Sequence, residues 1–134
     1  MRSRRFAFTL PALALALALP ATVLAGSDKD GTQGRAKTIE VNAPSSDKYL
    51  QFHGRIFITS GKTTTEYRWG GTSCGSRTMT PEMVALLVDV VRDREEIIVT
   101  PTYQDGQGAN TKCLVGFSLK HKESGGKGGK PQPS

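Results

Sequence analysis

Two cysteines are the residues of this 134-residue sequence best suited to covalent chemistry. They are Cys74, within a turn-rich stretch, and Cys113. An even number of cysteines in an exported chain predicts a disulfide. That bond would close a loop of about 40 residues and stabilise the domain by roughly 4 kcal/mol. The alternative is a nucleophilic Cys74, which requires a free thiol.

The two histidines could supply general-base or metal chemistry. His53 falls in the expected fold, whereas His121 lies at the start of a polar tail. A catalytic histidine needs a carboxylate that orients its ring, and we expect Glu66, the candidate, to be taken by Arg55. The cysteines and histidines also lack the paired spacing of a zinc site. We therefore expect no catalytic residues, no metal and no cofactor.

Aromatic and charged side chains alternate along two predicted strands, and this composition favours a binding surface. From residue 49 to 58 apolar and polar residues alternate, and a similar pattern follows from 62 to 69. Arginine and aromatic residues on a rigid surface are typical of protein-interface hot spots. The predicted binding residues are Tyr49, His53, Arg55, Phe57, Glu66 and Arg68. The alternative is an ordinary half-solvated sheet face, or one covered by a further layer.

A β-hairpin must position these side chains. Period-two alternation predicts two strands, and Ser60-Gly61 predicts the turn between them. If Thr59 pairs with Lys62, then Tyr67 lies opposite Gly54 and Glu66 lies opposite Arg55 in a cross-strand ion pair. The inner face is then expected to bury five residues under a helix: Leu50, Phe52, Ile56, Ile58 and Trp69.

That helix is predicted over residues 80–94. Thr80 is a suitable N-cap, Pro81 suits the first helical position, and Glu82 complements the positive end of the helix dipole. Apolar residues then recur at helical spacing and are numerous enough to predict burial over most of the helix circumference.

The remaining elements predict the fold class. A short strand is expected at 38–41, and a second hairpin is formed by 96–103 and 111–120, with Cys113, Val115, Phe117 and Leu119 on one side. The order is therefore strand, hairpin, helix, hairpin. We predict an α+β fold: a small antiparallel sheet with one buried helix packed on one face and one disulfide.

Both ends of the chain are expected to lie outside this domain. Residues 1–25 combine a basic start, an apolar run and small residues before Ala25, which is the pattern of a cleaved signal peptide. Residues 26–37 are predicted to be a flexible lead, 38–120 a single domain, and 121–134 a disordered Gly/Lys/Pro tail. The mature protein is therefore expected to be periplasmic or secreted, with no membrane span in the mature chain.

Charge and export together suggest the function class. The net charge is +6, but residues 38–119 hold 8 basic and 9 acidic side chains, so we expect no nucleic-acid partner. We predict a non-catalytic binding domain of the bacterial envelope with a protein partner, such as an inhibitor or immunity protein against an envelope-targeted enzyme. The alternatives are a small secreted hydrolase using Cys74 or His53, or a structural, self-assembling envelope protein.

Overall fold

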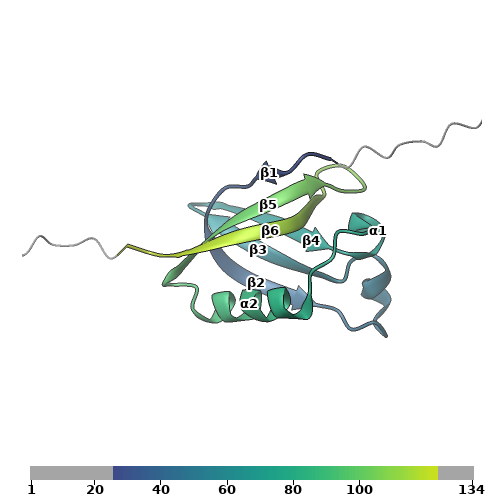
Figure 1. The fold of residues 1–134 in the computed structure, drawn as a ribbon, viewed down its shortest axis with the longest axis horizontal. Helices are drawn as coiled ribbons and strands as arrows, with labels where there is room; N and C mark the ends of the chain where they lie inside the picture. The colour runs from purple at the N-terminus through teal and green to yellow at the C-terminus, as the bar shows by residue number, and fades with distance from the viewer. Residues whose placement is uncertain (1–25, 124–134) are drawn as a thin grey trace, which may run out of the picture.

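The structure, a computed structural model, describes residues 26–123. The expected signal peptide and most of the expected tail lie outside these residues. The strands and helices are shown in Figure 1: β1 (Lys29–Asp30), β2 (Arg35–Val41), η1 (Asp47–Leu50), β3 (Gly54–Ser60), β4 (Thr63–Trp69), α1 (Gly71–Cys74), α2 (Pro81–Arg92), β5 (Ile97–Asp105) and β6 (Lys112–His121). The α+β class is confirmed.

The sheet is larger than expected and mixed. Its strand order is β1-β5-β6-β4-β3-β2, and all neighbours are antiparallel except β4 and β6, which are parallel at Arg68 and Cys113. The two edges, β1 and β2, are successive parts of one chain segment. Gly34, between them, pairs with Val99 of β5. The sheet therefore curls until its edges meet and forms a small barrel.

The closure uses the segment that was expected to be a flexible lead. Residues 26–37 instead contain β1 and the first residues of β2. At Gly34 the chain passes from β5 to β3, and a Cβ there would collide with the backbone of Thr59. Glycine suits such a corner because it has no side chain. Residues 26–37 are mostly polar and show no alternation, so their pattern did not predict that they form strands.

The β3–β4 hairpin forms, but its register differs from the expected one by two residues. Ser60 pairs with Thr63, so Gly61 and Lys62 make the turn, and Gly61 has a φ of 59°. Glycine at the first turn position supports this geometry. A two-residue shift keeps every strand side chain on its face. It changes the partners, however: Trp69 lies opposite Gly54, and Arg68 lies opposite Arg55.

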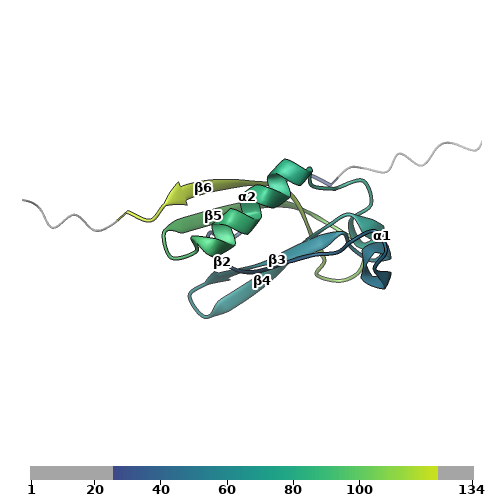
Figure 2. The same ribbon diagram turned by 90° about the horizontal axis from the view of Figure 1, so that it is seen from below.

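Helix α2 begins where the sequence predicts. The Thr80 side chain accepts a hydrogen bond from the Met83 amide at 3.3 Å, and Pro81 is the first helical residue. In Figure 2 the β5–β6 and β3–β4 pairs form opposite walls, and α2 lies across the opening between them. Only Leu87 and Val90 of this helix are buried. The expectation of burial over most of its circumference was wrong, because the sheet covers a single face.

The core combines both hairpins, β2 and the helix. Its buried residues are Ala36, Ile56, Ile58, Tyr67, Trp69, Leu87, Val90, Val99 and Leu114. Leu50, expected to be buried, is 74% exposed because it ends η1 and precedes the strand. Leu114 enters the core because β6 has an irregular register: Tyr103 pairs with Leu114 and Thr102 with Gly116.

Candidate binding site

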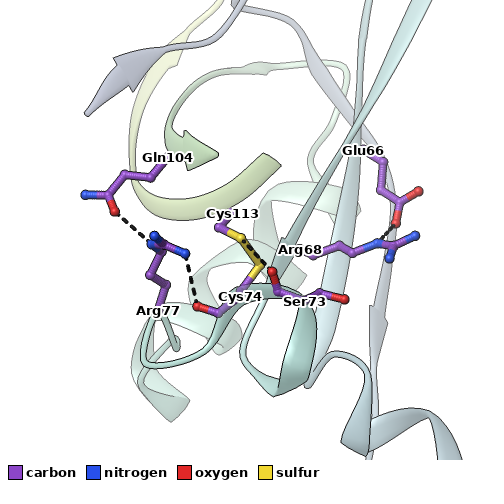
Figure 3. The surroundings of a disulfide bond; sticks show 7 residues. All are labelled: Glu66, Arg68, Ser73, Cys74, Arg77, Gln104 and Cys113. Carbon is purple, nitrogen blue, oxygen red and sulfur yellow. Dashed lines mark hydrogen bonds and ion pairs between the residues drawn. A yellow bond between two sulfur atoms is a disulfide. The ribbon is translucent and has the colours of Figure 1, made fainter. Parts of the chain in front are cut away.

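The disulfide between Cys74 and Cys113 is confirmed. Their sulfur atoms are bonded, and their Cα atoms lie 5.5 Å apart (Figure 3). Both side chains are buried, and the described residues contain no free cysteine. Cys74 is thus not available here as a thiolate nucleophile. The bond ties α1, in the connection between β4 and α2, to the beginning of β6.

Tyr49 and His53 lie apart from the other predicted binding residues. Their rings stack with centroids 4.0 Å apart and planes 12° apart. They line an open groove of about 460 Å³ together with Val84 and Ala85 of α2. The strand begins only at Gly54, so the alternation that was expected to align these two residues with Arg55 does not extend to them.

An ion-pair network covers the outer surface of β2, β3 and β4. At its centre, Arg55 lies between Glu40 and Glu66. The Arg55 Nε atom donates to Glu40 Oε2 at 2.8 Å, and Nη1 donates to Glu66 Oε1 at 3.5 Å. Lys48 Nζ lies 3.1 Å from the other Glu40 oxygen, and Arg68 Nε donates to Glu66. Glu66 is therefore occupied by two arginines and does not orient His53.

A buried phenylalanine lies beneath this network. The guanidinium carbons of Arg55 and Arg68 lie 5.1 Å and 5.0 Å from the centroid of the Phe52 ring. Arg55 also lies 5.2 Å from the Phe57 ring. Phe52 is 4% exposed, but it is not part of the main core cluster. Phe52 is therefore buried as expected, but beneath the two arginines and outside the core cluster that includes residues of α2. Cation–π contacts of this kind contribute about 0.5–2 kcal/mol.

The central ion pair favours the charged form of Glu40. Hydrogen bonds from Arg55 and then from Lys48 hold the pKa of the Glu40 carboxyl below its usual value. The cations Lys48, Arg55 and Arg68 outnumber the anions Glu40 and Glu66 by one. The face therefore carries a small positive excess.

We use the term charged face for one set of residues on this surface. Its members are Glu40, Lys48, Phe52, Arg55, Phe57, Glu66 and Arg68. The sequence predicted Arg55, Phe57, Glu66 and Arg68 by alternation. It missed Glu40, whose contact with Arg55 depends on the pairing of β2 with β3. It also missed Lys48 and the outward position of Phe52, which depend on how the chain turns between β2 and β3.

Within 26–123, no group of three or more His, Cys, Asp and Glu side chains could hold a metal ion. None of the helices in this part of the chain combines the length and apolarity needed to cross a membrane. Comparisons with protein-family models, curated proteins and solved structures found no match.

Proposed function

We propose that this chain is an exported, non-catalytic binding domain of the bacterial envelope that captures a protein partner through the charged face. The observation that carries the proposal is the position of Arg55 and Arg68. Both guanidinium groups lie over one buried ring and are held by carboxylates. Side chains that are fixed before binding lose little conformational entropy when a partner docks.

The proposed site also has the composition of an interface hot spot. Arginine and aromatic residues dominate such sites, particularly where their surroundings exclude water. The Arg55 and Arg68 side chains are 25% and 31% exposed, so part of each remains accessible to a partner. Phe57, half-buried beside Arg55, adds apolar surface.

The order in which the barrel strands are connected also favours this surface as the binding site. If β1 and β2 are counted as one bent strand, five strands form the barrel, and the helix joins the third strand to the fourth. This is the connectivity of OB-fold barrels, which bind ligands on the face of their second and third strands and on adjoining loops. Here those strands are β3 and β4. Fold analogy indicates a surface and not the ligand.

The role of inhibitor or immunity protein is the finer part of the proposal. A small barrel that a disulfide ties together changes little in shape on binding, as is common in protein–inhibitor complexes. The oxidised bond also suits a compartment outside the cytoplasm, in agreement with the signal-peptide pattern of residues 1–25.

A capture experiment tests the proposal. Residues 26–134, with the disulfide intact, are immobilised and exposed to an envelope extract. A protein captured by the wild-type chain should be lost from the Phe57→Ala/Arg68→Ala double variant. The matched control is Arg92→Ala, because Arg92 is an exposed arginine of α2 that pairs only with Asp89 in the described residues. Equal capture by all three chains would refute the proposal.

A further inference from the structure

The two arginines of the charged face differ in how many of their nitrogens are occupied. Arg55 uses all three: Nε and Nη2 contact Glu40, and Nη1 contacts Glu66. Arg68 uses Nε alone, for Glu66. Within residues 26–123, Nη1 and Nη2 of Arg68 have no hydrogen-bond partner, and the side chain is 31% exposed. Arg68 therefore presents an unoccupied pair of donors to the solvent.

This pair of donors is held in a defined position. Glu66 binds Nε, and the Phe52 ring lies 5.0 Å from the guanidinium carbon. The main chain of Arg68 pairs with Cys113, which is bonded to Cys74. In Figure 3 the Arg68 guanidinium lies beside Glu66 and away from the disulfide. The donors are thus fixed by contacts on several sides before any ligand arrives.

A small hollow adjoins Arg68. Its volume is about 120 Å³, and its lining residues are Glu66, Arg68, Ala109, Asn110, Thr111 and Lys112. This volume corresponds to about four water molecules, which is enough for one carboxylate and too small for a nucleotide. The lining includes two cations and a single anion, Glu66, which already pairs with both arginines of the face.

Lys112 adds a second cation to the hollow. Its Nζ atom lies 5.3 Å from the centroid of the Tyr103 ring, which supports its position. Asp105, directly opposite Lys112 on β5, interacts with it electrostatically but forms its ion pair with Lys29, at 2.5 Å. Within residues 26–123 Lys112 thus forms no ion pair of its own, which leaves its ammonium group available to an incoming anion.

We propose that Arg68 and Lys112 form an anchor for one aspartate or glutamate side chain on an acidic segment of the partner protein. The carboxylate would accept two parallel hydrogen bonds from Nη1 and Nη2 of Arg68 and contact the Lys112 ammonium group. Planar, bidentate recognition of a carboxylate is the geometry that arginine provides and lysine does not. This inference rests on the proposed function and identifies the partner chemistry at the same face.

The direct test uses a fluorescein-labelled hexaglutamate peptide and the oxidised chain 26–134. Fluorescence anisotropy at low ionic strength should show binding that Arg68→Ala weakens about tenfold, because charge-assisted hydrogen bonds are lost. Arg68→Lys should also weaken binding, since it keeps the charge and removes the paired donors. Lys112→Ala should weaken binding less, and Arg92→Ala should leave it unchanged.

Three outcomes would overturn the anchor. They are failure of the wild-type chain to bind hexaglutamate, equal binding by Arg68→Ala, and preference for a triphosphoserine peptide of matched charge. Thermal melting of Arg68→Ala and Arg68→Lys shows whether each variant is folded. If Arg68→Lys alone is folded, undiminished binding by that variant overturns the bidentate contact.

The capture experiment separates this inference from the proposed function. Partner loss from Phe57→Ala with full retention by Arg68→Ala would refute the anchor and leave the charged face as the binding site. Retention by both single variants and by the double variant would refute the proposed function itself. Loss from Arg68→Ala and from Arg68→Lys, with retention by Arg92→Ala, would support both.

Discussion

Arg55 and Arg68 lie directly opposite each other on β3 and β4, and both guanidinium groups lie about 5 Å from the same phenylalanine ring. Like charges at directly opposite positions of an antiparallel pair are destabilising. Here Glu40 and Glu66 offset the repulsion, each by pairing with an arginine. The arrangement of the face therefore depends on the acidic residues as much as on the arginines.

Replacing Glu40 should destabilise the protein. In Glu40→Gln, Arg55 loses the closer of its two ionic partners and keeps only Glu66, while it remains opposite Arg68 and half-buried. We expect a loss of about 1 kcal/mol in the free energy of unfolding. The ion pair is partly exposed, so water weakens the attraction between Arg55 and Glu40 without removing it. Urea denaturation at pH 7 measures it. Glu123→Gln, which changes an exposed carboxylate at the end of the described chain, is the control and should have no effect.

The contribution of Glu40 should depend on pH. Its carboxyl pKa in the folded state lies below the usual value of 4.5. A depressed pKa in the folded state means that the ionised form stabilises the fold above the unfolded-state pKa, and that this stabilisation is lost as pH falls through the folded-state pKa. The stability difference between wild type and Glu40→Gln should be complete at pH 7 and shrink below about pH 4.5. A difference that stayed constant down to pH 3 would contradict this.

The disulfide should dominate the stability of the domain. Reduction should lower the free energy of unfolding by roughly 4 kcal/mol in the chain-entropy account. Titration of the non-reduced, denatured chain with a thiol reagent should find no free thiol, and titration after reduction should find both. The double variant Cys74→Ser/Cys113→Ser should melt at a much lower temperature. A free thiol in the non-reduced chain would revive the nucleophile hypothesis.

Closure of the barrel should be sensitive to a single methyl group. In Gly34→Ala the new Cβ would meet the Thr59 carbonyl, where the chain passes from β5 to β3. We expect a loss of about 2 kcal/mol or more, since the backbone has to shift. Gly116→Ala is the matched control, because a Cβ there makes only ordinary contact with Thr102 at 3.8 Å. Thermal melting of both variants compares them, and equal melting temperatures would refute the closure argument.

Local physics made several elements predictable from the sequence. The helix begins at Pro81 because Thr80 caps it through a hydrogen bond within four residues of chain. Period-two alternation placed Arg55 and Phe57 on one strand face and Ile56 and Ile58 on the other, as the burial pattern of β3 shows. Four of the seven residues of the charged face could be predicted for the same reason, because they follow the alternation of β3 and β4.

Only the tertiary structure decided the remaining features. A register shift of two residues leaves both strand faces unchanged, so alternation alone could not tell whether Glu66 or Arg68 lies opposite Arg55. Glu40 joins the charged face because β2 pairs with β3, and Gly34 completes the barrel because it meets Val99, 65 positions later in the sequence. These contacts join residues far apart in the chain. Local propensity does not encode them, because their free energy is gained only when the whole barrel closes.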